Sequence, residues 1–401
     1  MNTKKTDFLI IGAGIIGINL ALSLRAKYKA SSITIIEKEK KPALHASGRN
    51  SGVLHSGFYY TPDSIKAAFC RDGNKYLTEY CLQRKLPINQ CGKVVVAKNE
   101  DDLEGLDILL ERGRKNNVEL IEIDQKQTKE IDPNVSTFKR AIFSPNTSTV
   151  DPKLVVNSLI DQLKEKSIVL ITDNAYVKSE GNLIYTSRGR IEAGFVINSA
   201  GLYADKIALD FGFSDNYRIL PFKGIYLYTN HERFNLKTCV YPVPDLKNPF
   251  LGVHLTVDVN GRTKIGPTAM PAFWREQYSG FKNFVFSESL EIIFREISLF
   301  FNNHFNFRSL ALDELKKQSK RRMIKDIKSM APSLGLEKLS HWGNPGIRAQ
   351  LVNILDKKLE MDFIFEGDRK SFHILNAVSP AFTCSKPFAD HVVSQIEHNL
   401  S

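Results

Sequence analysis

Three glycines near the start of the 401-residue chain are the first residues whose spacing indicates chemistry. Gly12, Gly14 and Gly17 form the run GAGIIG, which follows an apolar segment at 7–11 and precedes a helical pattern. Glycines let the backbone approach a pyrophosphate closely, and the following helix offers it unpaired N–H groups. Glu37 ends the next β-branched run, where its carboxylate can accept hydrogen bonds from a ribose diol. The pattern predicts a dinucleotide with a free ribose 2′-hydroxyl, FAD or NAD; a tight structural turn is the alternative.

Two further segments separate FAD from NAD. Residues 45–52, HASGRNSG, are small and polar and follow Glu37 closely, so they could wrap a pyrophosphate and a ribityl chain. Ser379 and Pro380 precede the last helical pattern, whose positive N-terminus suits the electron-rich edge of a flavin. Each segment alone fits an ordinary loop or helix start equally well, but together with the glycine run they favour FAD. The predicted cofactor-binding residues are Gly12, Gly14, Ile15, Ile16, Gly17, Glu37, Lys38, Ser47, Asn50, Ser51, Gly52, Val53, Ala200, Gly201, Ser379, Pro380 and Ala381.

These residues need an α/β scaffold to hold them. Parallel strands buried on both faces, as in a Rossmann-like sheet, are predicted by the apolar runs at 7–11, 32–36, 194–198 and 372–375. Residues 251–258 alternate between apolar and polar types, and Asn260-Gly261 supplies a hairpin turn, so an antiparallel sheet is expected there. We expect two domains of discontinuous sequence: an FAD-binding domain of residues 1–88, 145–215 and 342–401, and a substrate domain of residues 89–144 and 216–341.

The composition is that of a globular protein, with 42% hydrophobic and 25% charged residues and a formal net charge of +11. A basic chain favours nucleic acid, an anionic membrane surface or an acidic substrate as partner. Five cysteines without a CxxC pair argue against a disulfide framework and a structural zinc site, so no metal and a reducing cytosol are expected. Lys4 and Lys5 precede an apolar run at 8–24 that is similar to a signal peptide. Glycines interrupt that run, so a buried strand and helix are expected, and no stretch of about 20 apolar residues could cross a bilayer.

Longer runs carry a resemblance to a known family. These runs are HASGRNSGVLHSGFYY at 45–60 with its continuation TPDSIK at 61–66, PFKG at 221–224, FLGVHLT at 250–256, GIRAQ at 346–350 and NAVSPA at 376–381. In order and spacing, over nearly the whole chain, they resemble the L-2-hydroxyglutarate dehydrogenase/oxidase family of D-amino-acid-oxidase-like flavoenzymes. The resemblance implies noncovalent FAD and oxidation of L-2-hydroxyglutarate to 2-oxoglutarate, with electrons passed to a quinone-linked acceptor or to oxygen.

The same resemblance suggests residues for the reaction, in which a base takes the hydroxyl proton while the C2 hydride moves to flavin N5. His55, in the glycine-rich loop, is the preferred base, and His254 is the other candidate; either could instead be structural, and His254 could face solvent. Arg348 matches the family arginine near the flavin and is assigned to a substrate carboxylate, against the alternative of a surface ion pair. Lys223 and Tyr60 are the further predicted substrate-binding residues, with Tyr59 beside them.

Three positions depart from the family pattern. Arg49 stands where histidine is usual, Lys223 where arginine is usual and Thr268 where asparagine is usual. A lysine cannot reproduce the bidentate fork of an arginine, so the substrate could be another 2-hydroxy acid or an amino acid. Arg49 also removes a histidine that some related flavoenzymes use to attach flavin covalently. The alternatives are therefore a glycine or D-amino-acid oxidase, or a basic flavin-fold binding protein without turnover.

The segment 311–330 holds seven lysines and arginines against three acids. Just before it, apolar residues recur at helical spacing: Leu290, Ile293, Phe294, Ile297, Phe300 and Phe301. A pair of helices that docks on a membrane would suit an enzyme that reduces quinone, and a core-facing helix followed by a solvated one is the alternative. Nucleic-acid binding is not expected, because the basic run has no aromatic residue for base stacking. A cytoplasmic location, with peripheral attachment to the inner face of the cell membrane as an option, is expected.

Overall fold

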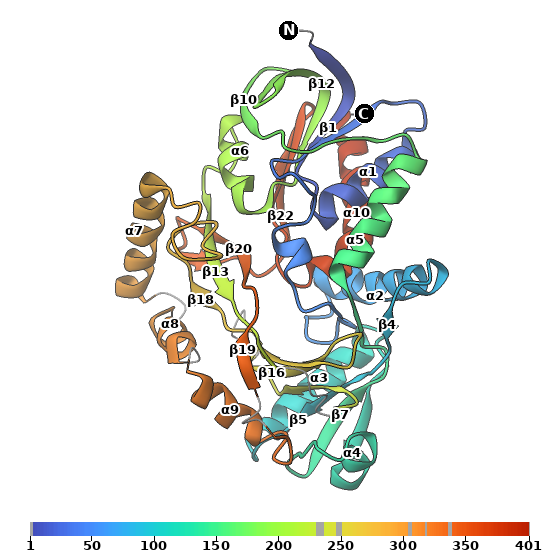
Figure 1. Ribbon diagram of the computed structural model, residues 1–401, viewed down its shortest axis with the longest axis vertical. Coiled ribbons are helices and arrows are strands. Elements are labelled where there is room, and N and C mark those ends of the chain that lie inside the picture. The colour runs from blue at the N-terminus through green and yellow to red at the C-terminus, as the bar shows by residue number, and fades with distance from the viewer. Residues whose placement is uncertain are drawn as a thin grey trace. The chain divides into compact units, whose positions relative to one another are not determined.

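The computed structural model describes residues 3–229, 236–245, 251–303, 307–316, 319–335 and 339–400 (Figure 1). Contacts within the chain divide it into two units. Unit 1 contains Met1–Asn50, Pro152–Pro221 and Arg348–Ser401, and unit 2 contains Ser51–Asp151 and Phe222–Ile347. Two residues that the sequence analysis used, Phe250 and Lys317, lie outside the described residues.

The boundaries of the two units differ from the predicted domain boundaries. Residues 51–88, 145–151 and 342–347 lie in unit 2, and residues 216–221 lie in unit 1. A small three-stranded sheet accounts for the largest difference, because β3 (Val53–Leu54) and β4 (Ile88–Asn89) both pair with β8 (Ser148–Val150). Strands this short leave no periodic pattern in the sequence. The assignment of one unit to FAD and the other to substrate stays a prediction.

Unit 1 is built on a sheet whose central strands are parallel. β1 pairs with β12 on one side and with β2 on the other, and β12 also pairs with β23. The α/β fold and the four predicted parallel strands are confirmed. The strands of this sheet are β1 (Lys4–Ile11), β2 (Ile33–Ile36), β9 (Val169–Ile171), β10 (Tyr176–Glu180), β11 (Leu183–Thr186), β12 (Gly189–Asn198), β22 (Ile364–Gly367) and β23 (Ser371–Asn376).

The helix that follows the glycine run is a core element of unit 1. α1 (Ile15–Lys27) is buried from Ile15 to Leu24 and packs against α5 (Pro152–Glu165) and α10 (Ala381–Leu400). Its polar residues are paired inside this contact, since Asn19 donates to Ser385 Oγ at 3.2 Å and Ser23 donates to Asp390 at 2.8 Å. The signal-like run at 8–24 is therefore a buried strand and helix, as expected. Among the helices of the described ranges, none is long and apolar enough to span a membrane.

A buried histidine joins the ends of two parallel strands in unit 1. Asn198 Nδ2 on β12 donates to His373 Nδ1 on β23 at 3.2 Å, so the ring proton lies on Nε2, which is 3.0 Å from Ser371 Oγ. His373 is fully buried, and burial lowers its pKa from about 6.5 to about 4. The ring is therefore neutral at physiological pH.

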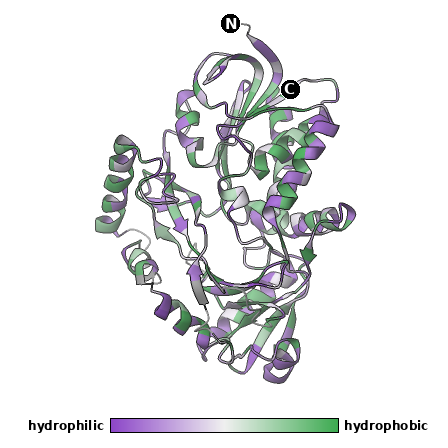
Figure 2. Ribbon diagram, viewed as in Figure 1, coloured by the Kyte–Doolittle hydropathy of each residue, from purple (hydrophilic) through white to green (hydrophobic). Residues whose placement is uncertain are grey.

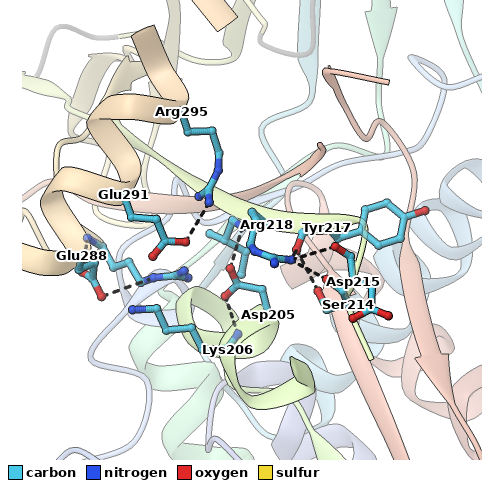
Figure 3. A network of polar contacts seen from close by, with 11 residues as sticks. Asp205, Lys206, Ser214, Asp215, Tyr217, Arg218, Glu288, Glu291 and Arg295 are labelled. Atoms are coloured by element: carbon cyan, nitrogen blue, oxygen red, sulfur yellow. Dashed lines mark hydrogen bonds and ion pairs between the residues drawn. The ribbon is translucent and has the colours of Figure 1, made fainter. Parts of the chain in front are cut away.

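Polar contacts also fix the connection from α6 (Ala204–Asp210) to the start of β13 (Tyr217–Gly224), a strand whose residues up to Pro221 belong to unit 1. The buried Asp205 accepts from the backbone N–H groups of Lys206 and Ile219, both at 2.9 Å, and Arg218 Nη1 donates to the carbonyl of Ser214 at 2.7 Å (Figure 3). These hydrogen bonds hold α6, the connecting turn and the start of β13 in fixed positions. Within unit 2, the same figure shows Arg295 paired with Glu291 at 2.8 Å on one helix.

Unit 2 contains an eight-stranded sheet in the order β19-β14-β17-β16-β15-β5-β7-β6. Its strands are β5 (Lys93–Val96), β6 (Ile121–Asp124), β7 (Arg140–Ser144), β14 (Leu227–Thr229), β15 (Cys239–Pro242), β16 (His254–Val257), β17 (Thr263–Gly266) and β19 (Leu339–Trp342). All described pairs are antiparallel except β5 with β15. The antiparallel expectation for 251–258 is thus confirmed, with β16 paired to β17 through the turn at Asn260-Gly261.

The helices of unit 2 pack on different parts of the unit, and only some of them contact this sheet. They are α2 (Ile65–Gln83), α3 (Asp102–Lys115), α4 (Gln125–Ile131), α7 (Phe286–Asn302), α8 (Phe307–Lys316) and α9 (Lys320–Lys328). α2 begins where Ser64 Oγ accepts from the N–H of Ala67, which satisfies a free donor of the first turn. α9 buries Met323 and Ile327 in the core beneath the sheet.

The neutral His373 makes a pH-dependent contribution to stability. Its folded pKa of about 4 lies below its unfolded value near 6.5, so the stabilisation is fully present above pH 6.5 and is lost as the pH falls toward 4. The loss amounts to about 3 kcal/mol. We expect the variant His373→Gln to lack this loss, whereas His398→Gln, at an exposed position of α10, keeps it. Free energies of unfolding from urea titrations between pH 4 and 7 measure the effect, and an unchanged acid slope in His373→Gln would contradict it.

Candidate functional site

The glycine run forms a tight turn, in which side chains at two of the three glycine positions would clash with the protein's own backbone. Gly12 has φ +104°, and a Cβ there would lie 2.7 Å from the carbonyl oxygen of Ser199. A Cβ at Gly17 would lie 2.0 Å from the carbonyl oxygen of Gly12. A Cβ at Gly14 would meet only the hydroxyl of Ser47, at 3.1 Å. Gly12 and Gly17 therefore let β1, β12 and α1 approach one another, while Gly14 faces a side where the protein itself leaves room.

Glu37 stands at the end of β2, next to this turn. Its carboxylate is 8% exposed and accepts from the backbone N–H groups of Ala13 and Glu39, both at 2.9 Å. Each carboxylate oxygen retains a lone pair beyond these bonds, so the group can still accept from a ribose diol. The side chain of Lys38, in contrast, forms an ion pair with Glu39, with 2.5 Å between Nζ and Oε1. Its Nζ also lies 5.5 Å from the centroid of the Tyr203 ring.

The loop after Glu37 is bonded to the start of α1. Ser47, in a 3₁₀ turn at Ala46–Gly48, accepts the N–H of Ile15 at 2.9 Å, so one donor of the first helical turn is already used. Asn50 holds the loop by donating to the carbonyl of Ser47 at 2.9 Å. Arg49 Nε donates to the carbonyl of Leu44 at 2.6 Å. This loop is therefore held in place beside the glycine turn. Most of the polar groups named here already make hydrogen bonds within the protein.

Ser51, Gly52 and Val53 belong to unit 2 rather than to the glycine turn's unit. Gly52, with φ +74°, accepts from the N–H of Val150 at 2.8 Å, and Val53 begins β3. The carbonyl of Ser51 accepts from Lys264 Nζ at 2.6 Å. The predicted cofactor residues at 47–53 are thus shared between the two units.

The remaining predicted cofactor residues lie at two other ends of strands in unit 1. The N–H of Ala200 donates to Asn198 Oδ1 at 3.2 Å, and Gly201 has φ +57° with open space where a Cβ would stand. Ser379 is exposed just before α10, and Pro380 accepts the N–H of Cys384 at 3.1 Å. Ala381 begins that helix. These positions follow β12 and β23, whose carboxyl ends lie on the same edge of the sheet as that of β1.

The predicted substrate residues lie in both units. Arg348 is half-buried on β20 (Gly346–Asn353) in unit 1. Lys223 is half-buried on β13 in unit 2, where burial lowers its pKa. Thr268, the third departure from the family pattern, supports this strand because its hydroxyl accepts from the N–H of Ile225 at 3.2 Å and donates to the carbonyl of Lys223 at 3.4 Å. Tyr60 is half-buried beside the buried Tyr59.

Both candidate histidines lie in unit 2 and belong to one polar region. His254 is 4% exposed, so the expectation that it could face solvent is wrong. Its Nδ1 donates to the carbonyl of Gly252 at 2.8 Å, and its ring stacks on Tyr241 with 3.7 Å between centroids. The pKa of His55 is well below its usual value, mainly through burial and further through the charges of Lys93 and His254. His55 is therefore a neutral imidazole, the form that accepts a proton.

Two buried lysines on this sheet were missed by the sequence analysis. Register places Lys93 of β5 opposite both Ser144 and Cys239, and Lys264 of β17 opposite Thr256. Burial lowers the pKa of each lysine to about 8. The only sequence signal was a lysine inside an otherwise apolar or β-branched run, KVVVA and TKIG, and such a lysine is more often at a strand edge facing water.

The residues of unit 1 fit the adenine-dinucleotide part of FAD. They provide a glycine turn with room at Gly14, a helix N-terminus, a carboxylate with free lone pairs and two further strand ends on the same edge of a parallel sheet. This combination of fold and site defines a dinucleotide-binding α/β protein.

Comparison with known proteins gives the family. Residues 7–394 match the family described as DAO, FAD dependent oxidoreductase. The chain is 36% identical over 405 residues to the L-2-hydroxyglutarate dehydrogenase of Escherichia coli strain K12, covering 98% of this chain and 94% of that protein. It is 32% identical over 422 residues to the mitochondrial L-2-hydroxyglutarate dehydrogenase of Homo sapiens, covering 100% and 90%. The chain belongs to the DAO family of FAD-dependent oxidoreductases and, within it, to the L-2-hydroxyglutarate dehydrogenases.

Solved structures support the fold. An L-α-glycerophosphate oxidase from Mycoplasma pneumoniae with FAD bound matches with a TM-score of 0.77 at 22% identity, over 98% of this chain and 95% of that one. A glycine oxidase from Geobacillus kaustophilus matches with a TM-score of 0.72 at 16% identity, over 100% and 96%. The predicted flavoenzyme fold and the predicted FAD cofactor are confirmed, while the role of each site residue stays a prediction.

The different surroundings of two glycines lead to a paired prediction. Gly14→Ala adds a methyl group that needs only a small shift of Ser47, so the apoprotein should fold, but the methyl group occupies the space left for a pyrophosphate. We expect FAD affinity to fall at least tenfold, about 1.4 kcal/mol. Gly17→Ala drives a Cβ into the carbonyl of Gly12 and should destabilise the apoprotein itself. Melting of the apoproteins and FAD titration separate the two effects; equal FAD affinity in Gly14→Ala and wild type would remove Gly14 from the cofactor site.

Proposed function

We propose that this enzyme oxidises L-2-hydroxyglutarate to 2-oxoglutarate with noncovalently bound FAD. The observation that carries the proposal is identity of 32–36% with proteins named L-2-hydroxyglutarate dehydrogenase, over nearly the full length of both chains. The geometry of unit 2 supports it, because His254 shares a sheet with the buried cations Lys93 and Lys264, and the charge of Lys93 helps to hold the pKa of His55 well below its usual value. Such a region suits an anionic substrate that must lose a proton.

The chemistry requires two electrons and two protons to leave the substrate. FAD, when bound, accepts a hydride from C2 at its N5 and later passes the electrons to a second acceptor. His55 takes the hydroxyl proton in this proposal, since its imidazole is neutral before the reaction. His254 is the alternative base, with its ring held in direction by the bond from Nδ1 to the carbonyl of Gly252.

The two carboxylates of the substrate need separate cations. In this proposal the guanidinium fork of Arg348 binds one carboxylate, the point charge of Lys223 binds the other, and Tyr60 is a further substrate-binding residue. Because Lys223 replaces an arginine, this contact is a single rather than a bidentate one. Its half-buried position and the support from Thr268 favour a fixed direction for that single contact.

The flavin is noncovalent in this proposal because Arg49 stands where related enzymes can carry a nucleophilic histidine. The guanidinium of Arg49 is bonded to its own loop at Leu44 and carries no nucleophilic nitrogen at neutral pH. The predicted pyrophosphate contacts, Ser47 and Asn50 among them, then hold the cofactor without a covalent bond.

Anaerobic reduction tests the substrate. We expect L-2-hydroxyglutarate to bleach the visible flavin bands of the purified enzyme, whereas D-2-hydroxyglutarate, glycine and D-amino acids leave them. Arg348→Ala should raise KM for L-2-hydroxyglutarate on the order of 100-fold through loss of a charge-assisted pair, with FAD content unchanged. Arg369→Ala, at an exposed position of the same unit, is the matched control and should change neither.

The alternatives have distinct outcomes in this assay. Bleaching by glycine or a D-amino acid in place of L-2-hydroxyglutarate would identify an amino-acid oxidase. A protein that binds FAD but is reduced by none of these compounds would be the non-catalytic binder. An unchanged KM in Arg348→Ala would remove Arg348 from the substrate site.

We further propose that the electron acceptor is a quinone and that α7 brings the enzyme to an anionic membrane. Most helices bury apolar residues and expose charged ones, but α7 also does the reverse. It buries Glu288 and Glu296, while the side chains of Phe286, Phe294 and Phe301 are 68%, 67% and 73% exposed. The core-facing alternative for this helix therefore accounts for only part of its apolar residues. Phe281 and Phe284, just before the helix, are exposed as well.

Positive charge is exposed on a later helix of unit 2. α7, α8 and α9 follow one another along it, and Figure 2 shows mixed hydropathy on α7 and a mainly hydrophilic α9. α9 keeps Met323 and Ile327 in the core and exposes Arg321, Arg322 and Lys325. Exposed aromatic rings and exposed basic residues on one unit are complementary to an anionic lipid surface, where the rings enter the headgroup layer and the cations meet phosphate.

Vesicle binding tests this surface. Wild-type enzyme should sediment with vesicles that contain phosphatidylglycerol, less with phosphatidylcholine alone and less at high salt. Phe286→Ser, Phe294→Ser and Phe301→Ser combined should abolish binding and quinone reduction while turnover with a soluble dye persists. The matched control replaces three exposed apolar residues elsewhere, Leu82, Val169 and Val177, by serine. Vesicle binding equal to wild type in the phenylalanine variant, or a wild type that dimerises without binding vesicles, would contradict the proposal.

A further inference from the structure

Lys93 is a fully buried cation whose Nζ makes no hydrogen bond to any group that the structure describes. It lies instead among three aromatic rings, 5.3 Å from the centroid of Phe58, 4.9 Å from Tyr59 and 4.6 Å from Tyr241. The negative faces of aromatic rings attract a cation and replace part of its lost hydration. A buried lysine without a carboxylate partner is costly, so its retention calls for a functional reason.

The contacts of Lys93 lead to both candidate histidines. The Tyr241 ring that lies near its Nζ also carries the imidazole of His254, with 3.7 Å between the ring centroids. Tyr59, the second ring, lies in the same loop segment as His55. Ser56, the residue after His55, shares a hydrogen bond of 2.8 Å with Ser144, and the register of β5 and β7 places Ser144 opposite Lys93. Lys93 and His55 therefore repel each other electrostatically when both are charged. Lys93 is therefore an element of the histidine region rather than of a separate site.

Lys93 cannot itself hold the substrate. Its Nζ is sealed from solvent and is enclosed by Phe58, Tyr59 and Tyr241. A substrate carboxylate would have to displace at least one of these rings to touch it. An influence on the reaction must therefore act through the electric field, which is strong where water is excluded.

We propose that Lys93 is a positioning residue whose charge keeps the imidazole of His55 unprotonated and ready to accept the substrate's hydroxyl proton. The proposal rests on the assignment of His55 as the base under Proposed function. The aromatic rings hold the cation in place without neutralising it, which a carboxylate partner would do. The register of β5 in the sheet fixes the position of the charge.

The other groups around His55 act in defined directions. His254 of β16 opposes protonation of His55, as Lys93 does. Cys70 of α2 donates its thiol proton to the His55 carbonyl at 3.2 Å, so it holds the backbone rather than the ring. Near Lys93, the thiols of Cys70, Cys91 and Cys239 favour its charged form, and burial opposes it. The pKa of Lys93, about 8, leaves the cation in place throughout the range in which His55 titrates.

The sign of the effect follows from these charges. With Lys93 charged, His55 binds a proton only at a pH well below 6.5. Without that charge, burial and His254 remain, and the titration moves up toward 6.5. The acid limb of kcat/KM must move with it if His55 is the base.

The test uses the FAD-loaded enzyme with two substitutions of similar length. Lys93→Met removes the charge and keeps an apolar side chain among the rings; Lys93→Arg keeps the charge. We expect Lys93→Met to raise the titration midpoint of His55 by about one pH unit, measured by NMR of histidine-labelled enzyme with His55→Gln to assign the signal. The acid limb of kcat/KM should rise by the same amount. Lys93→Arg should leave both near the wild-type values.

The outcomes distinguish this proposal from the proposed function. An unchanged His55 midpoint in a Lys93→Met enzyme of normal FAD content and melting temperature would overturn the role of Lys93. An equal shift in Lys93→Arg would also overturn it, because packing rather than charge would then be responsible. If the His55 midpoint moves and the acid limb does not, Lys93 acts on His55 as proposed, and the assignment of His55 as the base is wrong.

Discussion

The organisation of unit 1 depends on one close approach of backbone to backbone. The carbonyl of Gly12 and the Ser199 segment leave no room for a side chain at Gly12 or Gly17. Because these glycines permit the contact, β1 can pair in parallel with β12, which is distant in the sequence, while α1 starts directly against both strands. The strand ends and the helix N-terminus that suit a dinucleotide follow from this arrangement.

Unit 2 solves a different physical problem, the burial of positive charge. Lys93 and Lys264 are both held on one sheet without a carboxylate partner among the described residues, the first among aromatic rings and the second against the carbonyl of Ser51 and the ring of Tyr226. Cations kept unneutralised in a dry region favour a neutral histidine and attract an anion. The same sheet that forms the core thereby sets the electrostatics expected for oxidation of a dicarboxylate.

Much of this could be predicted from local sequence. The spacing of Gly12, Gly14 and Gly17, the acid at 37 and the β-branched runs report directly on backbone conformation and burial, so the α/β fold and the dinucleotide turn were accessible. The unit boundary near residue 51 was not, because the pairing of β3 and β4 with β8 joins distant residues through very short strands. The exposed phenylalanines of α7 were visible as a periodic pattern, but periodicity alone does not show which side faces the core.

The sequence by itself determined the cofactor class, the parallel strands and the family, since each of these depends on residue types at fixed local spacing. Only the tertiary structure decided the burial and the contacts of the side chains. In it, His254 is buried against Tyr241, Glu37 accepts a hydrogen bond from the glycine turn, and Lys93 is enclosed by aromatic rings. The reason is that burial and charge at one residue depend on neighbours that cross-strand pairing brings from distant parts of the chain, and no local pattern records them.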